Sequence, residues 1–147
     1  MTYSKITKEN FEDWLNLGML LWPDHSREEL RKDFSDTLES HNEEVFGCKN
    51  DQNELIAFIS LSIRSDYVEG SSTSPAGYVE GIFVKPDYRN QGIANKLVKM
   101  GEEWTVSKGC TEIGSDAEIE NVESQKFHKK IGFKEANRIV SFIKKLS

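Results

Sequence analysis

The sequence GYVEGIFVKPDYRNQGIA, from Gly77 to Ala94, passes from an apolar segment through a short polar turn into a helical pattern. Gly77 to Val84 predicts a buried strand, and Lys85 to Tyr88 predicts a turn. A helix is expected from Gly92 to about Lys108, because apolar residues recur on one of its faces. The segment therefore predicts a strand–turn–helix unit.

The connection into this helix, Arg89 to Ala94, predicts a phosphate-binding site. A helix N-terminus leaves its first four backbone N–H groups without partners and carries a partial positive charge. It therefore binds a phosphate or pyrophosphate well where the backbone can come close. Gly92 has no Cβ to prevent that approach, Ala94 is the next smallest residue, and the Arg89 guanidinium can pair with phosphate oxygens.

Other interpretations of this turn are weaker. A glycine beside a helix start is common for turn reasons alone. A Rossmann dinucleotide site requires a three-glycine fingerprint, whereas Gly92 comes late in the chain, after several predicted strands. A Walker loop requires a Gly-Lys-Ser/Thr end, which this turn lacks. Both of these nucleotide-binding motifs are therefore disfavoured.

The N-terminal third predicts a strand followed by two helices. A short strand is expected at Tyr3 to Ile6. The first helix starts near Phe11, where apolar residues begin to recur at helical spacing, and stops before Pro23. Ser26 followed by Glu29 is typical of a capping box, which opens the second helix.

The remainder of the chain alternates strands and helices. A β-hairpin is expected at Glu44 to Lys49 and Leu55 to Arg64, followed by a polar, substrate-side loop from Ser65 to Ala76. The C-terminal part predicts a strand at Cys110 to Ser115, a short helix at Asn121 to Ile131 and a final strand at Phe133 to Lys145. The alternation indicates the α/β (α+β) class, with a mixed sheet and helices on both faces.

Composition and charge exclude several classes of protein. The chain has 147 residues, a length typical of one domain, and carries 19 basic and 25 acidic residues for a net charge of −6. It has no basic block to neutralise nucleic-acid phosphates and no apolar run long enough for a signal peptide or a membrane span. We therefore expect a soluble, cytoplasmic protein that binds neither nucleic acid nor membrane. Cys48 and Cys110 stand far apart, so neither a metal site nor a disulfide is predicted.

Two motifs together resemble the GNAT superfamily of N-acetyltransferases. Arg89, Gly92 and Ala94 fit that family's acetyl-coenzyme A motif, Arg/Gln-x-x-Gly-x-Gly/Ala after a strand. The second motif, from Asn121 to Phe133, is similar to the family's Asn-x-x-Ala…Leu-Tyr-x-Lys-x-Gly-Phe segment. The resemblance implies a single N-acetyltransferase domain over residues 1–147, with a mostly antiparallel sheet and splayed central strands. It also implies acetyl-coenzyme A as cosubstrate, and no metal.

Further similarities lead to the aminoglycoside 6′-N-acetyltransferases within that superfamily. They extend over Arg64 to Val68, Ser74-Pro75, Glu80 to Val84, Lys108 to Cys110 and Ser115-Asp116, with Trp22-Pro23 near the start. The resemblance implies acetyl transfer to the 6′-amine of a polycationic aminoglycoside by direct attack, and hence antibiotic resistance. Neither cysteine would then carry the acetyl group. Because family members commonly dimerise, a homodimer is expected.

The resemblance also assigns cofactor contacts residue by residue. The backbone of the strand before the turn would hold the pantetheine arm, the turn and helix start would hold the pyrophosphate, and an asparagine would hydrogen-bond the arm. In this order, the residues are Ile82, Phe83 and Val84; Arg89, Asn90, Gln91, Gly92, Ile93 and Ala94; and Asn121.

A few side chains are assigned to the substrate and to proton transfer. Glu80 and Asp116 would bind the substrate ammonium groups, and Glu80 would help to remove a proton. Trp22 and Tyr67 would cover a sugar ring or a cation. His128 stands where many relatives have the tyrosine that protonates the departing thiolate. Each also has a structural interpretation, since carboxylates and histidines are often simply paired in a fold and aromatic residues often belong to its core.

Besides a structural α/β module, which an absence of cofactor binding would identify, two other functions fit the same patterns. A GNAT enzyme could act on another amine, such as a polyamine, an amino acid or a protein N-terminus. A non-catalytic acyl-coenzyme A sensor could bind the cofactor without turnover. A panel of amine acceptors separates the first from an aminoglycoside acetyltransferase, and cofactor binding without any turnover identifies the second.

Overall fold

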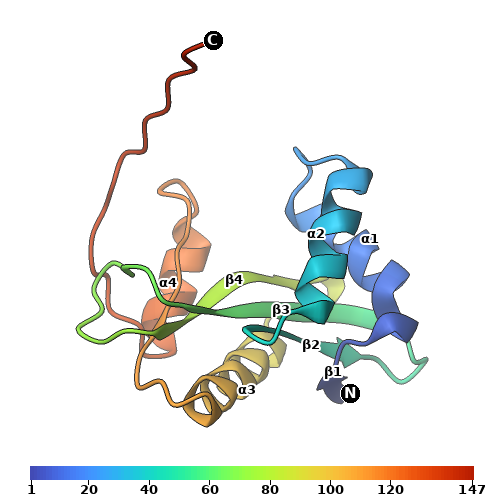
Figure 1. Cartoon of the computed structure of the whole chain (residues 1–147). Helices are drawn as coiled ribbons and strands as arrows, with labels where there is room; N and C mark the ends of the chain where they lie inside the picture. The colour runs from blue at the N-terminus through green and yellow to red at the C-terminus, as the bar shows by residue number, and fades with distance from the viewer. The chain divides into compact units, whose positions relative to one another are not determined.

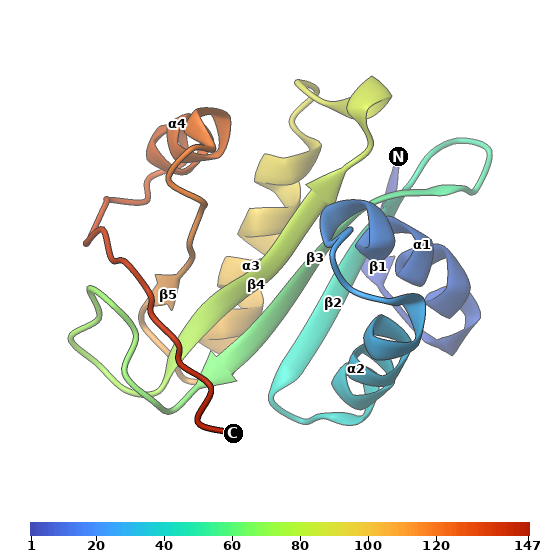
Figure 2. The same ribbon diagram turned by 90° about the horizontal axis from the view of Figure 1, so that it is seen from above.

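The computed structural model describes residues 1–147, which divide into two compact units, Met1–Ser115 and Asp116–Ser147. The first unit holds a five-stranded sheet in the order β1-β2-β3-β4-β5 (Figures 1 and 2). Neighbouring strands are antiparallel except β4 and β5, which are parallel. The strands are β1 (Thr2–Lys5), β2 (Glu43–Lys49), β3 (Leu55–Arg64), β4 (Ala76–Val84) and β5 (Ile113–Gly114). The predicted mixed, mostly antiparallel sheet is thereby confirmed.

Helices of the first unit cover both faces of this sheet, as predicted (Figures 1 and 2). Helices α1 (Phe11–Leu21) and α2 (Arg27–Glu39) lie on one face, and α3 (Ile93–Ser107) lies on the other. A short 3-10 helix, η1 (Lys8–Asn10), precedes α1, and another, η2 (Pro86–Tyr88), connects β4 to the turn before α3. The strand–turn–helix unit predicted for residues 77 to 108 is therefore present.

Local sequence signals set the helix boundaries. The Ser26 side chain accepts a hydrogen bond from the Glu29 N–H at 3.1 Å, which satisfies one of the unpaired donors at the start of α2. Helix α1 ends at Leu21, before Pro23, because a proline disfavours helical backbone in the residue before it. Both predicted boundaries are confirmed, although α2 has only the Ser26 half of the predicted capping box, since the Glu29 carboxylate lies beside His25.

The main core lies between the sheet and the α1–α2 pair. Trp14 of α1 stacks on Phe34 of α2 with ring centroids 4.0 Å apart, and its edge meets Phe58 of the central strand β3. Burying each such side chain stabilises the fold by roughly 1.5–3 kcal/mol. The buried residues of this cluster are Ile6, Trp14, Leu15, Leu17, Leu30, Phe34, Val45, Leu55 and Phe58. The β3 strand is thus held rigidly beside β4, which carries the candidate site.

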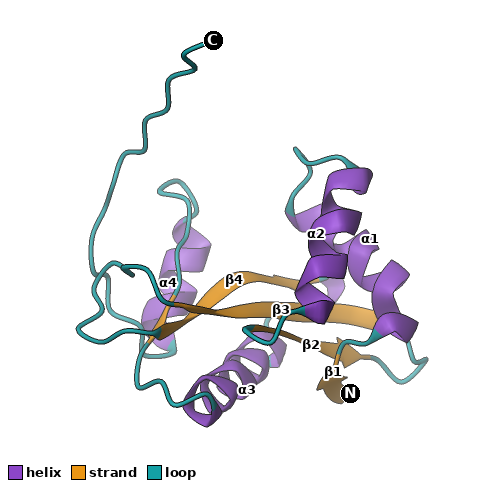
Figure 3. Cartoon of the chain, in the orientation of Figure 1, coloured by secondary structure: helices purple, strands orange, loops and turns teal.

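The second unit differs from the sequence prediction after its helix, α4 (Val122–Lys130). The strand predicted for Phe133 to Lys145 is wrong, because this segment has no regular secondary structure (Figure 3). Ile139, Val140, Phe142 and Ile143 are between 66% and 98% exposed. Their apolar, β-branched pattern favours a strand, but a strand needs a neighbour to pair its backbone, and the second unit contains no other strand.

The predicted strand at Cys110 to Ser115 is reduced to the two residues of β5. Its parallel pairing with β4 covers only Gly77 and Tyr78, so the rest of β4 has no strand partner on this edge. The splay of the central strands therefore stays a prediction. No helix in the structure combines the length and the apolar character that crossing a bilayer requires.

Candidate active site

Helix α3 begins with backbone N–H groups that the protein leaves unpaired. Its N-cap Gly92 accepts the first helical hydrogen bond, from the Lys96 N–H at 3.0 Å, and no side chain caps the helix. The N–H groups of Ile93, Ala94 and Asn95 consequently have no acceptor within the protein. The first turn also contains no acidic residue, so the partial positive charge of the helix end is uncompensated. This helix end can therefore bind an anion.

Two residues of the preceding turn have left-handed backbone conformations. Gly92 has a φ of 81° and Asn90 a φ of 63°, a region that favours glycine and tolerates asparagine. Left-handed residues in such turns help successive N–H groups to converge on an anion. A Cβ built on Gly92 meets no atom within 4 Å, so that side of the turn is open. The backbone conformation itself thus favours glycine here, in addition to the close approach inferred from the sequence.

Arg89 anchors the turn to the end of β4. Its Nε donates a hydrogen bond to the Val84 carbonyl at 2.7 Å, and its guanidinium carbon lies 5.4 Å from the centroid of the Phe83 ring. The two terminal nitrogens of the guanidinium make no hydrogen bond or ion pair within the protein. The Gln91 side chain adds a longer bond to the Asp87 carbonyl, at 3.4 Å. The same arginine can therefore fix the turn and still present donors to a phosphate.

The main chain of β4 approaches this turn along an edge without a strand partner. β5 contacts β4 only at Gly77 and Tyr78, whereas β3 pairs with β4 as far as Val84. The edge opposite β3, which includes Ile82, Phe83 and Val84, therefore has no neighbouring strand. An extended ligand arm could add to such an edge through main-chain hydrogen bonds.

A β-bulge in β4 separates Glu80 from the regular pairing with β3. Ser60 of β3 lies opposite Gly81, and Leu61 lies opposite Val79, which leaves Glu80 as the extra residue. Bulges redirect side chains and are frequent beside active sites. The sequence alone does not reveal the bulge, because the strand pattern continues on both sides of Glu80.

The bulge changes which face of the sheet the alternate residues of β4 meet. A Cβ added to Gly77 would lie 2.5 Å from Thr105 of α3. A Cβ added to Gly81 would instead lie 2.5 Å from Trp22, on the α1 side of the sheet. In a regular strand Gly77 and Gly81 would face the same side, since alternate residues share a face. The extra residue Glu80 therefore moves the second half of β4 by one position relative to the two helix layers.

Glu80 is held by a pair of polar side chains from β3. Its carboxylate accepts hydrogen bonds from Arg64 Nε at 2.9 Å and Nη2 at 2.7 Å, and from Ser62 Oγ at 2.5 Å. The Arg64 guanidinium carbon lies 3.6 Å from the centroid of the Tyr78 ring. The side chains of Arg64 and Glu80 are 41% and 32% exposed, respectively. Glu80 thus has the partner that its place in an apolar strand requires, and it remains accessible to a ligand.

Of the two aromatic residues predicted to contact substrate, one packs directly against the bulge. Trp22 lies on the backbone of Gly81, next to Glu80, and contacts Phe34 and Phe58 with centroid distances of 6.1 and 6.2 Å. Trp22 is only partly buried, so part of its ring packs in the core and part remains exposed to solvent. Tyr67 lies on the loop after β3 and is 73% exposed.

Three predicted site residues lie in the second unit. Asn121 caps α4, because its Oδ1 accepts a hydrogen bond from the Ser124 N–H at 3.0 Å. His128 Nδ1 lies 2.7 Å from the Ser124 carbonyl oxygen. A carbonyl only accepts, so Nδ1 carries the proton, and a neutral His128 has Nε2 as an acceptor. Asp116 follows β5 by two positions along the chain.

Glu112, which the sequence reasoning missed, organises the loop between β3 and β4. Its carboxylate accepts hydrogen bonds from the N–H groups of Ser72 and Thr73, at 2.9 and 2.8 Å, and from the Thr73 hydroxyl. Val68 anchors the other side of the loop by packing with Ala76 and Tyr78. No motif marks Glu112, because its partners lie in a loop about 40 residues away along the chain. The predicted substrate-side loop is therefore held in a defined conformation.

Glu112→Gln is expected to loosen this loop, because a neutral amide accepts these hydrogen bonds more weakly than a carboxylate. Amide exchange at Ser72 and Thr73 should become roughly tenfold faster at neutral pH. Glu103→Gln, an exposed change on α3, serves as the control and should leave exchange there unchanged. Equal exchange rates in both variants would contradict the role of Glu112.

The same loop contact should weaken in acid. The hydrogen bond from the Thr73 hydroxyl, together with those from the backbone, lowers the pKa of Glu112 from its ordinary value. A group with a lowered folded-state pKa contributes its full stability above its unfolded pKa, about 4.3 for glutamate. The contribution is then lost as the pH falls through the folded-state value.

The chain matches the model of the acetyltransferase (GNAT) family over residues 9–133. It is 39% identical over 146 residues to aminoglycoside N(6′)-acetyltransferase type 1 of Acinetobacter baumannii, covering 99% of each chain. It is 36% identical over 138 residues to the enzyme of the same name from Serratia marcescens, covering 94% of each chain.

Solved structures agree with these sequence relationships. Aminoglycoside N-acetyltransferase AAC(6′)-Iy in complex with CoA superposes with a TM-score of 0.94 at 36% identity, over 97% of this chain and 93% of that one. The same enzyme in complex with the bisubstrate analog CoA-S-monomethyl-acetylneamine gives a TM-score of 0.93 at 35% identity, over 98% and 97% of the two chains. With the open α3 N-terminus following the bulged strand β4, these matches show that the chain belongs to the acetyltransferase (GNAT) family.

Proposed function

We propose that this protein is an acetyl-coenzyme A-dependent aminoglycoside N(6′)-acetyltransferase, which confers antibiotic resistance. The observation that carries the proposal is the uncapped N-terminus of α3 behind the left-handed Gly92, in a chain closely related to enzymes of that name. Acetyl-coenzyme A supplies the activated thioester. The AAC(6′)-Iy complex with CoA supports this cosubstrate.

Residues of the turn and of β4 would hold the cosubstrate. The unpaired N–H groups of Ile93 and Ala94, with those of the turn residues Asn90, Gln91 and Gly92, would bind the diphosphate. Arg89 would add charge through its terminal nitrogens. The backbone of Ile82, Phe83 and Val84 would bind the pantetheine arm along the unpaired edge of β4. Asn121 would contribute its Nδ2, since its Oδ1 already caps α4.

Glu80 would bind the 6′-ammonium of the substrate and accept its proton, directly or through one water. The freed amine would attack the thioester carbonyl, forming the C–N bond as the C–S bond breaks. The products are the N-acetylated aminoglycoside and coenzyme A. Trp22 beside Gly81 and the exposed Tyr67 would cover the sugar rings, and Asp116 would bind a further ammonium group.

A thiol leaving group needs little help from a general acid in order to depart. The pKa of an ordinary thiol is about 8.5, so coenzyme A departs as a comparatively stable thiolate at neutral pH. His128 donates Nδ1–H to the Ser124 carbonyl, so it could protonate the thiolate only from an imidazolium Nε2. We therefore propose His128 as an assisting proton donor whose main contact orients its ring.

An acyl-enzyme route is disfavoured by the surroundings of the cysteines. Cys48 and Cys110 are both buried. Burial also raises the pKa of the Cys48 thiol, which disfavours the nucleophilic thiolate. Direct attack by the amine needs neither residue.

The decisive test is a thiol-release assay with acetyl-coenzyme A and a panel of amines that includes kanamycin, polyamines, amino acids and peptide N-termini. We expect turnover with the aminoglycoside and product acetylated at the 6′-amine, as identified by NMR. Turnover only with another amine would refute the substrate assignment. Cofactor binding by calorimetry without any turnover would instead identify an acyl-coenzyme A sensor.

Asp116→Ala is expected to raise the KM for kanamycin about tenfold, because a charged hydrogen bond to an ammonium group contributes roughly 1.5 kcal/mol. The Kd for acetyl-coenzyme A should remain unchanged, since Asp116 is not part of the phosphate-binding turn. Calorimetry and steady-state kinetics measure the two quantities separately. A parallel loss of both would contradict a role confined to the substrate.

We also propose that the protein acts in the cytoplasm as a homodimer. The proposed dimer rests on the frequent dimerisation of family members. The proposed location rests on the intracellular supply of acetyl-coenzyme A. Sedimentation equilibrium should give twice the chain mass of 16.8 kDa. A monomer mass at micromolar concentration would reject the dimer.

A further inference from the structure

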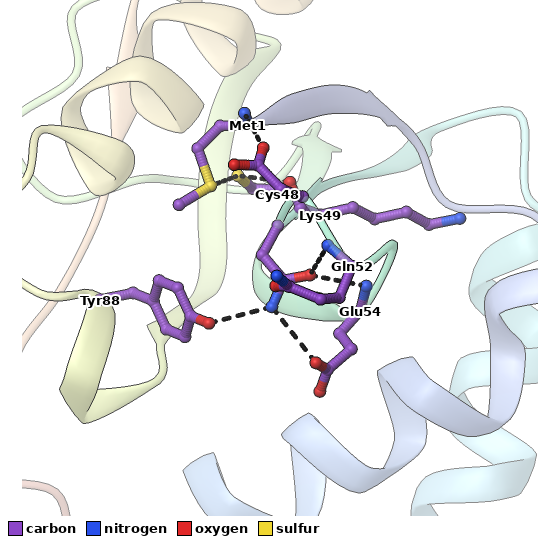
Figure 4. Close-up of polar contacts among 8 residues, drawn as sticks. Met1, Cys48, Lys49, Gln52, Glu54 and Tyr88 are labelled. Carbon is purple, nitrogen blue, oxygen red and sulfur yellow. Dashed lines mark hydrogen bonds and ion pairs between the residues drawn. The ribbon is translucent and has the colours of Figure 1, made fainter.

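A buried asparagine connects the β2–β3 hairpin to the turn that precedes α3. Asn50, only 6% exposed, lies just after β2, and its Nδ2 donates a hydrogen bond to the Tyr88 hydroxyl at 2.9 Å. Figure 4 shows the Tyr88 ring directed toward this hairpin turn, where Gln52 and Glu54 also lie. Tyr88 is the last residue of η2 and immediately precedes Arg89. Two segments far apart in the sequence thus meet at one buried amide.

The hydrogen-bond network fixes the orientation of the Asn50 amide. Its Oδ1 accepts from the backbone N–H groups of Gln52, at 3.0 Å, and Glu54, at 2.9 Å. Only the oxygen can accept two such bonds, so Nδ2 must face Tyr88. The Tyr88 hydroxyl therefore acts as the acceptor. A further contact joins Nδ2 to Glu54 Oε1 at 3.5 Å.

Few other contacts hold the turn between Tyr88 and α3. The Tyr88 N–H bonds to the Lys85 carbonyl at 2.9 Å, and Arg89 Nε bonds to the Val84 carbonyl at 2.7 Å. Asn90, Gln91 and Gly92 are exposed, and no side chain caps α3. The start of η2 is tied to β3 by the Lys85 N–H, which bonds to the Ile56 carbonyl at 2.9 Å, and between Tyr88 and Gly92 the hydrogen bond to the Tyr88 side chain ties the segment to the β2–β3 hairpin.

We propose that Asn50 is a positioning residue for cofactor binding, acting through Tyr88 to hold the Arg89–Gly92 turn in the geometry that receives the diphosphate. The inference rests on the proposed function and concerns its cosubstrate site. A turn that is already ordered does not have to be ordered on binding, so its N–H groups bind an anion more tightly. Asn50 itself makes no hydrogen bond to the turn between Arg89 and Gly92.

The test begins with Tyr88→Phe, which deletes one oxygen and keeps the ring. We expect the Kd for acetyl-coenzyme A, measured by calorimetry, to rise about tenfold, as for the loss of one ordering hydrogen bond. The kcat at saturating cosubstrate and the KM for kanamycin should stay within about twofold. Asp51→Asn is the matched control, because Asp51 is in the same hairpin turn but pairs with the N-terminal ammonium, at 3.4 Å.

A variant that reverses the direction of this hydrogen bond distinguishes the bond from general stability. In the double variant Asn50→Asp with Glu54→Gln, an aspartate oxygen would accept from the Tyr88 hydroxyl, and the glutamine would remove the nearby carboxylate. This variant should bind acetyl-coenzyme A within about twofold of the unmodified protein, and adding Tyr88→Phe to it should restore the tenfold loss.

The possible outcomes distinguish a failure of the positioning role of Asn50 from a failure of the proposed acetyltransferase function. An unchanged Kd in Tyr88→Phe, whether or not the melting temperature falls, would overturn the positioning role while leaving the acetyltransferase function intact. A tenfold loss in Tyr88→Phe, together with near-normal affinity in the double variant and a renewed loss when Tyr88→Phe is added to that double variant, would support the positioning role. If the unmodified protein binds no acetyl-coenzyme A, the proposed function fails first, and the positioning role fails with it.

Discussion

Replacing Gly92 by aspartate is expected to raise the Kd for acetyl-coenzyme A about a hundredfold. The new carboxylate would lie beside the unpaired N–H groups at the start of α3, where the diphosphate is expected to bind. Two like charges about 5 Å apart repel by roughly 3 kcal/mol at an effective dielectric constant of about 20. An energy of that size corresponds to about a hundredfold in affinity. Isothermal titration calorimetry with acetyl-coenzyme A measures the effect.

Two matched variants separate charge from backbone strain. Gly92→Asn has nearly the same shape as Gly92→Asp without the charge, and both residues tolerate the left-handed conformation better than other side chains. Gly109, at the C-terminal end of α3, has a φ of 85° and, like Gly92, no atom within 4 Å of an added Cβ. Gly109→Asn therefore imposes the same strain at the far end of the same helix, and it should leave the Kd unchanged. Equal affinities of the Gly92→Asp and Gly92→Asn variants would contradict an anion site at this turn.

The parts of the fold that the sequence predicted correctly are those governed by local physics. Ser26 caps α2, and Pro23 follows the end of α1, because capping and proline effects act within a few residues. The turn before α3 is also a local feature. Gly92 both permits the left-handed conformation and leaves the helix end open.

The final strand predicted for Phe133 to Lys145 shows the opposite case. Its apolar, β-branched residues meet the compositional requirement for a strand. Composition does not supply a partner, however, and a strand exists only where another strand pairs with its backbone. The second unit provides no such strand. Strand pairing depends on the tertiary structure, so the apolar, β-branched pattern of this segment cannot predict it.

The candidate site shows the same limit at the level of single contacts. The sequence indicated Glu80 and required that it have a partner, but it identified neither Arg64 as that partner nor the bulge at this position. Glu112 and Asn50 were missed because each acts on segments about 40 residues away. A polar residue that hydrogen-bonds to a segment far away along the chain produces neither a periodic pattern nor a recognisable motif in the sequence.

Glu80→Gln is expected to lower kcat/KM for kanamycin about a hundredfold, because losing a general base typically costs a factor of 10² to 10⁴. Glutamine has nearly the shape of glutamate and can still bond to Ser62 and Arg64, so the fold should be retained. It carries no charge and accepts no proton at neutral pH. The Kd for acetyl-coenzyme A should be unchanged, which calorimetry can check beside the kinetic measurement.

Arg64→Gln separates this catalytic role from a structural one, because it removes the same ion pair but keeps the carboxylate. Both side chains are partly exposed, and pairs of that kind contribute about 0–1 kcal/mol. Losing the pair alone therefore accounts for about a fivefold effect at most, far less than a hundredfold. If Glu80 acts on the substrate, Arg64→Gln should retain most of the activity, and the double variant should resemble Glu80→Gln. Equal losses in the two single variants, with no further loss in the double, would instead make Glu80 a partner of Arg64 alone and would place the proton acceptor elsewhere.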